Sequence, residues 1–348
     1  MAPLLLYSLA EFRELIFACL DAVDARSLVE VGCEEAAFTE ELLRWAEKRG
    51  GRVHCVEPEP GDLLLEVSQS SAAVHLYKQR SPEALEEVPP SDAYFLDGDH
   101  NYWTVLEELR TIARRRGGLG GAVVFLHDVG WPCARRDLYY SPESLPQDGV
   151  HPHTFARGVT PDSRHVVQGG HRGEGQFAWA LEEGGSRNGV LTGVEDFLAE
   201  HSDLTMAMVP CLFGLGVVYS PSSPSAGALA DVLRPYDDNV LLRRLEGNRL
   251  DLYLRVLELQ DSLEATELYV RDVNTENRAL VAQVRTLETQ LEELTSRSQR
   301  LIGESDALLA SRAFAIAERL SRLAGPKGPG GGLSRQRLRD AVEEARES

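Results

Sequence analysis

The sequence predicts an α/β fold in which a doubly wound parallel sheet ends in an antiparallel strand pair and is followed by a long C-terminal helix. Three observations predict this organisation. Strand-length apolar runs alternate with helical patterns through the first 130 residues, two apolar halves meet at Pro210 within 204–220, and a 3,4 repeat of apolar residues runs from Leu242 to Leu301. Alternating strands and helices are typical of a parallel sheet covered on both faces.

The predicted sheet begins with five short strands rich in Val, Leu and aromatic residues. They are SLVEV (27–31), RVHCV (52–56), AVHLY (73–77), AYFL (93–96) and AVVFLH (122–127). Helical patterns lie between them at 36–49, 60–70 and 103–116. In such a sheet the ligand crevice lies beyond the carboxyl ends of the strands, so the residues that follow each strand are the first candidates for a site.

The chain after the fifth strand divides into segments of different composition. Residues 129–185 are rich in Gly, Pro and His and exceed the usual length of a loop, so we expect a lid or insertion within a domain that spans 1–220. The remaining segments are a helix (188–201), an antiparallel strand pair (204–220), a linker (221–236), a coiled coil (237–310), and a short amphipathic helix with a flexible tail (311–348).

The 237–310 segment carries the repeat of a two-stranded coiled coil. Leu or Val fills most d positions, and the a positions include Val256, Val270 and Val284, the β-branched choice that favours two parallel strands. Asn277 falls on an a position, where it would specify register. We therefore expect a homodimer through a parallel coiled coil. The alternative, a single amphipathic helix lying on the globular domain, would require a wider apolar stripe.

Composition excludes some partners and favours one compartment. With a formal net charge of −19, the chain lacks the surplus of Lys and Arg that nucleic-acid binding requires, so we expect no nucleic-acid partner. Five scattered cysteines without CxxC spacing favour a reducing cytoplasm. No stretch approaches the roughly 20 apolar residues of a transmembrane segment. The 311–325 pattern allows weak contact with a membrane surface, although a solvated helix is the preferred interpretation.

Two candidate cofactor ligands follow the first two strands. Gly32 forms a turn between a strand and a helix, which brings backbone amides up to a nucleotide-like ligand. Glu34 and Glu35 follow it where a dinucleotide fingerprint has further glycines, and their charge would repel a pyrophosphate. Glu57 ends the second strand, where a carboxylate can accept both hydroxyls of a ribose. This combination favours an adenosyl ligand without phosphates and disfavours an NAD-dependent oxidoreductase.

A resemblance to a known family rests on four segments: VEVGCEEAAFTEELL, VHCVEPEP, YFLDGDHNYWTVLEEL and GGAVVFLHDVGWP. They resemble successive motifs of the Rossmann-like class I S-adenosylmethionine-dependent methyltransferases, in the branch shared with catechol-type, macrolide-sugar and cephalosporin-hydroxylase-like enzymes. The resemblance covers about 25–220 and implies S-adenosyl-L-methionine as the cofactor. Glu30 and Gly32 would line its methionine part, Glu57 its ribose, and the QRSPEAL segment (79–85) would lie near its adenine. The implied cofactor-binding residues are Glu30, Gly32, Glu57, Ser81 and Asp97.

The resemblance also implies a site at the ends of the fourth and fifth strands. Metal-dependent members of the branch hold a divalent ion there, and Asp97, His127 and Asp128 fall on the ligand positions. Mg or Mn is the expected metal, although a histidine suits Mn better than Mg. Without an ion, His127 is the candidate general base. The structural alternative is that His127 caps the strand and Asp128 starts a turn.

Further candidates lie on either side of this pair. His100 is expected to contact the substrate or take part in catalysis, and Asp99 to cap the helix that begins near Asn101. The insertion contains four histidines without regular metal-ligand spacing, so a lid is preferred to a zinc site. The side chains of this lid that are expected to stack on or hydrogen-bond to a sugar or an aromatic ring are Trp131, Tyr139, Tyr140, Arg135 and Arg136.

These observations predict an S-adenosylmethionine-dependent O-methyltransferase that acts on a hydroxyl of a polar small molecule or glycan, with a sugar of a glycan or glycosylated natural product as the favoured acceptor. The alternative is a non-catalytic methyltransferase-like scaffold that dimerises or recruits partners through its coiled coil. The acidic turn at Glu34 and Glu35 favours the scaffold. Binding of S-adenosylhomocysteine would distinguish the two.

Overall fold

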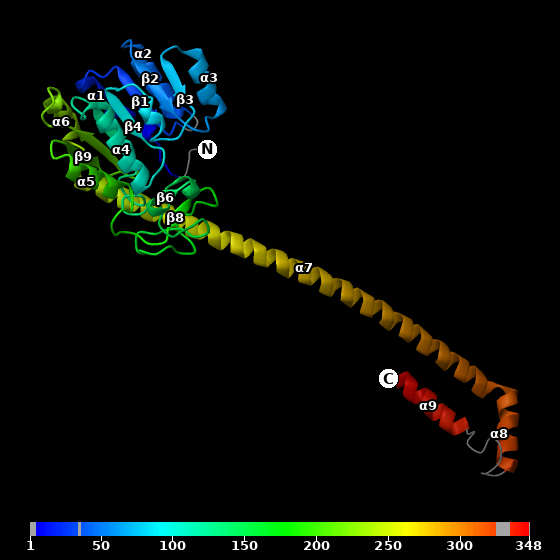
Figure 1. The fold of residues 1–348 in the computed structure, drawn as a ribbon. Helices are drawn as coiled ribbons and strands as arrows, with labels where there is room; N and C mark the ends of the chain where they lie inside the picture. The colour runs from blue at the N-terminus through cyan, green and yellow to red at the C-terminus, as the bar shows by residue number, and fades with distance from the viewer. Residues whose placement is uncertain (1–4, 34–35, 325–334, 348) are drawn as a thin grey trace. The chain divides into compact units, whose positions relative to one another are not determined.

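The computed structural model describes residues 5–33, 36–324 and 335–347, which form two compact units, Met1–Ser262 and Leu263–Ser348 (Figure 1). The first unit contains a seven-stranded sheet in the order β3-β2-β1-β4-β5-β10-β9. Its strands are β1 (Ser27–Val31), β2 (Arg52–Val56), β3 (Val74–Tyr77), β4 (Ala93–Leu96), β5 (Val123–His127), β9 (Thr205–Val209) and β10 (Leu215–Tyr219).

The sheet confirms the predicted fold class. β1 to β5 are parallel, and β10 pairs antiparallel with both β5 and β9. The sheet order reverses direction between β1 and β4, where a ligand crevice is expected in a doubly wound sheet. The carboxyl ends of β1, β2, β4 and β5 therefore lie at one edge.

Helices cover both faces of this sheet (Figure 1). α4 (Tyr102–Arg116) and α5 (Val190–Glu200) pack on one face. The other face carries α1 (Arg13–Ala22), α2 (Ala37–Glu47), α3 (Asp62–Ser70) and α6 (Ala226–Leu233). The short 3-10 helices are η1 (Leu9–Phe12), η2 (Ala84–Glu86), η3 (Pro142–Ser144) and η4 (Gln147–Gly149).

The start of α4 corrects one prediction about the site region. Asn101, and not Asp99, caps this helix, because the Asn101 side chain accepts a hydrogen bond from the backbone N–H of Thr104 at 2.9 Å. Asp99 instead accepts a 3.4 Å bond from the Thr104 hydroxyl. Asp99 is therefore left at the edge of the crevice.

The insertion is an ordered subdomain with its own sheet. β6 (Leu138–Tyr139), β8 (Ala178–Ala180) and β7 (His153–Thr154) pair antiparallel in that order. Buried Asp137 anchors the subdomain, since its Oδ1 accepts from the backbone N–H groups of Tyr102 at 2.8 Å and Gly189 at 2.7 Å. The insertion is thus hydrogen-bonded to the first residues of α4 and to the residue before α5.

The segment expected to be a linker is partly helical. Within 221–236, α6 buries Ala226, Leu229 and Leu233, and the two leucines belong to the same apolar cluster as α1. Each fully buried leucine stabilises the fold by about 1.5–3 kcal/mol, so this segment belongs to the globular unit and the linker prediction is wrong there. Small residues in AGALADVL made an ordered helix resemble a flexible segment.

α7 (Val240–Ala310) is one continuous helix whose first residues belong to the globular unit, where Leu250 is buried. In the second unit most of the apolar a and d residues are exposed, so the coiled coil stays a prediction. Two further helices follow, α8 (Arg312–Ala324) and α9 (Arg335–Glu347). The 335–347 part of the predicted flexible tail is therefore helical. Of the helices described here, none is both long and apolar enough to cross a membrane.

Candidate active site

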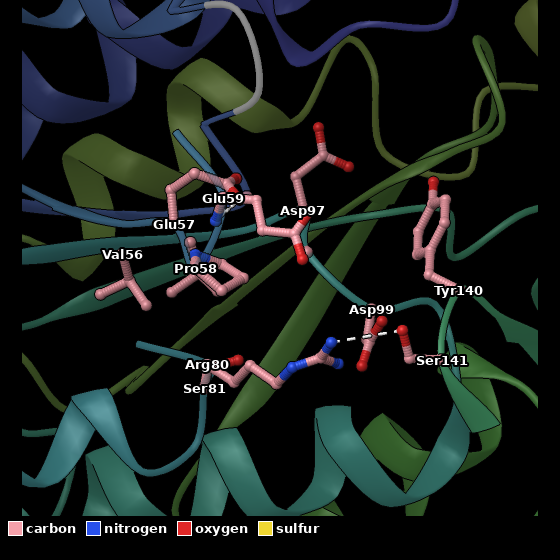
Figure 2. Close-up of a pocket in the computed structure, with 13 residues that line it drawn as sticks. Val56, Glu57, Pro58, Glu59, Arg80, Ser81, Asp97, Asp99, Tyr140 and Ser141 are labelled. Carbon is pink, nitrogen blue, oxygen red and sulfur yellow. Dashed lines mark hydrogen bonds between the residues drawn. The ribbon is translucent and has the colours of Figure 1, made fainter. Parts of the chain in front are cut away.

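A pocket of about 280 Å³ opens at the carboxyl ends of β1, β2 and β4 (Figure 2). It is lined by residues at or just after the ends of these strands, by two residues after β3 and by two from the insertion. They are Val31, Gly32, Val56, Glu57, Pro58, Glu59, Arg80, Ser81, Asp97, Gly98, Asp99, Tyr140 and Ser141. Four of the five predicted cofactor-binding residues thus meet at one cavity.

Gly32 allows two strand ends to approach closely at the base of this pocket. Its φ of +82° lies in the left-handed region, and a Cβ there would lie 2.3 Å from the carbonyl oxygen of Asp97. Any larger residue would push the turn after β1 away from the turn after β4. The following residues Glu34 and Glu35, which the sequence placed in an acidic turn, lie outside the described residues.

Glu57 joins the end of β2 to the glycine turn. Its Oε2 accepts from the backbone N–H of Cys33 at 3.1 Å, and its Oε1 accepts from the N–H of Glu59 at 3.1 Å. A carboxylate oxygen can accept more than one hydrogen bond, so the anchored side chain can also receive hydroxyls of a ligand. Its position is therefore fixed before any ligand arrives.

Glu30 does not line the pocket, in contrast to its predicted contact with the cofactor. It is 2 % exposed, and Thr39 of α2 donates a 2.6 Å hydrogen bond to its Oε2. Burial raises the pKa of Glu30 to about 8, so most of it is protonated at neutral pH. Cys33 and Cys55 lie beside it, and burial raises the pKa of the Cys33 thiol well above its usual value. Glu30, Cys33 and Cys55 thus form a buried cluster behind the glycine turn, and none of the three lines the pocket.

The side of the pocket after β3 is tied to α4 and to the insertion. Ser81 donates to the buried carboxyl of Glu108 in α4, and burial raises the pKa of Glu108 to about 8. Arg80 reaches across the pocket and donates to the hydroxyl of Ser141 at 3.2 Å (Figure 2). It also donates to the hydroxyl of Ser144 at 3.0 Å. The insertion therefore closes part of this side. Arg80 belongs to the QRSPEAL segment (79–85) that was expected near the adenine, whereas nothing in the sequence pattern indicated Glu108.

Beyond the pocket, carboxylates and imidazoles alternate in a chain of four side chains. His127 Nδ1 lies 3.0 Å from Asp97 Oδ1 and 3.5 Å from Asp128 Oδ2. His100 Nδ1 lies 3.1 Å from the same Asp128 oxygen. Asp128 reaches both rings from a left-handed backbone conformation, φ +59°, which is uncommon for a residue with a Cβ. The predicted catalytic and metal residues are thus brought together.

Both ring nitrogens of His127 are occupied. Nε2 lies 3.0 Å from the carbonyl oxygen of Leu212, which can only accept, so Nε2 carries a proton. Burial alone would lower the pKa of His127, but the carboxylates of Asp97 and Asp128 raise it well above its ordinary value. A buried, protonated ring between two carboxylates cannot take a proton from a substrate. This geometry argues against the predicted role of His127 as general base.

His100 is better placed for that role. Burial raises the pKa of Asp128, but His127 and His100 lower it further, so Asp128 remains a carboxylate that can orient the His100 ring. Among the residues that the structure describes, none hydrogen-bonds to His100 Nε2, and the His100 ring lies 6.0 Å from that of Tyr140, which lines the pocket. Asp128 and His100 form an acid–imidazole pair beside the cavity.

The same cluster has a donor set that fits a divalent cation. One nitrogen or oxygen of each of Asp97, His127 and Asp128 lies within 4.8 Å of the others. The bond from His127 Nε2 to a backbone carbonyl leaves Nδ1 for a ligand, a common arrangement for metal-bound histidines. A nitrogen with two carboxylates suits Mn or Zn better than Mg. Either a proton or a cation between these groups relieves the repulsion of the two carboxylates.

The insertion places aromatic side chains beside this cluster. Tyr140 is 41 % exposed, and its ring lies 6.1 Å from that of Phe177. His171 packs among aromatic rings, and burial lowers its pKa to about 4, so the ring is neutral. Among the described residues, the groups of side chains that could hold a metal include no histidine of the insertion. The lid stays a prediction, and of the side chains expected to contact the acceptor, Tyr139 and Arg136 are buried.

Comparisons with known proteins bear on β1 to β5 and the residues that follow them. Residues 29–129 match the model of a family described as a methyltransferase domain. This range contains Gly32, Glu57, Asp97, His127 and Asp128. No curated protein matches the chain by sequence.

Several solved structures are similar to this chain at low identity. A methyltransferase from Podospora anserina bound to S-adenosylhomocysteine is 12% identical, with 60% of this chain and 77% of that chain covered and a TM-score of 0.37. The O-methyltransferase TomG from Streptomyces achromogenes, in complex with S-adenosylmethionine, is 17% identical, with 62% and 82% covered and a TM-score of 0.35. An O-methyltransferase from Bacillus cereus is 13% identical, with 61% and 81% covered and a TM-score of 0.35.

Proposed function

We propose, from the premise that residues 29–129 are a methyltransferase domain, that this chain transfers the methyl group of S-adenosylmethionine to a hydroxyl of a polar acceptor. The observation that carries the proposal is the position of one cavity. It lies between the anchored carboxylate of Glu57 and the Asp97–His127–Asp128–His100 chain. A donor bound there would have its reactive end beside a candidate base.

The charge of the pocket supports this donor. Glu57, Glu59, Asp97 and Asp99 line it, with Arg80 as its one lining cation among the described residues. An acidic cavity would repel the phosphates of a dinucleotide but would attract a sulfonium cation. In this proposal Glu57 accepts the ribose hydroxyls, Ser81 lies beside the adenine, and Asp97 faces the methionine part.

The proposed reaction is an in-line displacement. The acceptor oxygen forms a bond to the methyl carbon, and the carbon–sulfur bond breaks with its electron pair going to the neutral thioether sulfur. His100 Nε2 takes the hydroxyl proton, and the Asp128 carboxylate stabilises the imidazolium that results. Well-placed general bases contribute roughly 10²–10⁴-fold to rate.

The proposal includes a divalent cation only as an ion that this chain's residues would bind. Asp97, His127 and Asp128 would hold it, with Mn favoured over Mg by the histidine. When bound, such an ion would lower the pKa of a nearby hydroxyl. Calorimetric titration of chelator-treated protein with Mn²⁺ tests this: Asp97→Asn should lose binding, whereas Asp62→Asn on the exposed start of α3 should not.

A sugar hydroxyl is the favoured acceptor. Tyr140 lines the pocket with a partly exposed ring that lies 6.0 Å from the ring of His100. The ring of Phe177 packs against that of Tyr140 in an edge-to-face contact. Aromatic faces of this kind stack on the C–H face of a sugar or on another ring, while nearby carboxylates and serines hydrogen-bond to hydroxyls.

A cytoplasmic location for this enzyme remains the expectation.

The alternative function is a non-catalytic scaffold that dimerises or recruits partners through α7. It is favoured by the apolar a and d residues of that helix, most of which are exposed in the single chain. We also propose that an active enzyme would use this helix to form a parallel homodimer. The two functions differ in whether the pocket binds a cofactor.

Calorimetry with S-adenosylhomocysteine separates these functions. The proposed enzyme should bind at micromolar concentrations, and Glu57→Gln should weaken binding at least about tenfold, because its amide group would face a backbone N–H that needs an acceptor. Glu66→Gln on the exposed face of α3 is the matched control and should bind normally. Absence of binding by the unaltered chain would favour the scaffold.

A further inference from the structure

We propose that Glu246, near the start of α7, is a positioning residue that holds the imidazole of His127 in place through the turn between β9 and β10. Its effect on methyl transfer rests on the proposed function, but its effect on the His127 ring does not. Glu246 lies 119 positions after His127 in the sequence and outside the region that resembles a methyltransferase. The inference therefore assigns a role in the site to the base of the long helix.

Glu246 binds the turn through both carboxylate oxygens. Oε2 accepts from the backbone N–H of Leu212 at 3.0 Å, and Oε1 accepts from that of Phe213 at 3.0 Å. Leu212 and Phe213 have φ values of +51° and +66°, both in the left-handed region that residues with a Cβ rarely adopt. A turn of this kind persists only where neighbouring groups hold it.

The same turn contacts the site from its other side. The carbonyl oxygen of Leu212 lies 3.0 Å from His127 Nε2, and that of Phe213 accepts from the N–H of Gly130 at 2.5 Å. Gly130 follows Asp128 by two residues. The turn is therefore hydrogen-bonded to both ends of the segment that carries His127 and Asp128.

One peptide group links the two side chains directly. The carbonyl of Leu212 and the N–H of Phe213 belong to the same peptide plane, so this group donates to Glu246 and accepts from His127. A carboxylate bound to the N–H side polarises the carbonyl and makes it a stronger acceptor. Loss of the carboxylate would both weaken the bond to His127 and let this peptide rotate.

Arg249 holds Glu246 as an ionised acceptor. Its Nε and one terminal nitrogen each lie 2.7 Å from a Glu246 oxygen, and its guanidinium lies 4.8 Å above the ring of Phe213. Burial would raise the pKa of Glu246, but Arg249 and the two backbone amides lower it below its usual value. The side chain of Glu246 is only 12 % exposed, so this charge is screened little by solvent.

Replacing Glu246 by Gln in the full chain tests the inference. The glutamine keeps the size of the side chain but offers one acceptor oxygen, so one of the two amides faces an NH₂ group. The matched control is Glu258→Gln, an exposed position of the same helix that pairs with Arg255. Cofactor affinity should stay within about twofold of the original in both variants, because neither residue lines the pocket.

The direct measurement is hydrogen exchange of the His127 Nε2–H in protein with ¹⁵N-labelled histidine, assigned by its loss in His127→Gln. In the unaltered chain and Glu258→Gln this proton should exchange slowly. In Glu246→Gln it should exchange at least about tenfold faster, and kcat should fall about tenfold with little change in KM. Unchanged exchange in folded Glu246→Gln would overturn the proposal, as would parallel losses of folded fraction, cofactor affinity and kcat.

If the unaltered chain transfers no methyl group, the proposed function fails, and the exchange measurement still decides the role of Glu246.

Discussion

Nδ1 of His100 lies 3.1 Å from Oδ2 of Asp128, and both side chains are about nine-tenths buried. Asp128 also lies 3.5 Å from Nδ1 of His127, but that ring donates from its other nitrogen to a backbone carbonyl. Of the two histidines bound to Asp128, His100 is therefore the one placed to exchange a proton with a substrate.

Replacing His100 by Asn should remove the base and leave the donor site intact. We expect kcat to fall by roughly 10²–10⁴-fold, with affinity for S-adenosylhomocysteine within about twofold of the original. Steady-state kinetics and calorimetry measure the two quantities. His165→Asn, at an exposed position of the insertion, is the control. Full activity of His100→Asn would exclude it as the base.

Glu30→Gln tests the buried carboxyl beneath the glycine turn. A folded-state pKa of about 8 lies above that of the unfolded chain, so the folded state binds this proton more tightly. The stability contributed by the protonated group is complete below the unfolded pKa and is lost as pH rises through 8. Glutamine mimics the protonated form and should therefore unfold less readily than glutamate at pH 8.5, by on the order of 2 kcal/mol, with a smaller difference at pH 5.5.

Chemical denaturation at the two pH values measures this difference. A gain that is equal at both would mean that the carboxyl does not titrate on unfolding. The same variant also separates a structural role from a cofactor contact: because Glu30 does not line the pocket, cofactor affinity should be unchanged.

Gly32→Ala should disrupt the base of the pocket. Its Cβ would overlap the carbonyl of Asp97 at 2.3 Å and would also occupy a left-handed conformation. Gly50→Ala would also place a Cβ on a left-handed backbone but would cause no clash, since nothing lies within 4 Å of a Cβ there. We expect a loss of about 1–2 kcal/mol at Gly50 and a larger loss at Gly32, together with loss of cofactor binding only at Gly32. Equal effects in denaturation and calorimetry would contradict the close approach.

The predicted homodimer can be tested within the exposed face of α7. Leu287 and Leu294 occupy d positions and are 56 % and 63 % exposed in the single chain. Leu287→Glu with Leu294→Glu should shift the protein to a monomer in sedimentation at micromolar concentration. Leu268 is also half exposed but falls on an f position, so Leu268→Glu should leave the dimer intact. A dimer that survives the double substitution would place the interface elsewhere.

The sequence was informative wherever local pattern decides structure. Each of the first five strands is an apolar run at its predicted place, and parallel strands bring the residues after them to one edge. Asp97, His127 and Asp128 could therefore be expected to meet, and they do. The antiparallel β9 and β10 follow equally from two apolar halves separated by a Pro-containing turn.

Contacts between distant segments could not be predicted in this way. His127 was expected to be a base because nothing near it in sequence shows that Leu212, 85 positions later, binds its second nitrogen. Glu246 falls on an e position of the heptad repeat, where a glutamate is common. Its hydrogen bonds to the turn at Leu212 and Phe213 appear only in the folded structure. α6 was mistaken for a linker because its small residues hide the spacing of the three that become buried.

The central claim is that the cavity beside Glu57 holds S-adenosylmethionine with its methyl group directed toward His100. A crystal structure with S-adenosylhomocysteine tests it most directly. We predict ribose hydroxyls bound to the Glu57 carboxylate and the sulfur facing the space between Asp97 and His100. A pocket that stays empty at saturating ligand, or a ligand bound away from Glu57, would contradict the account.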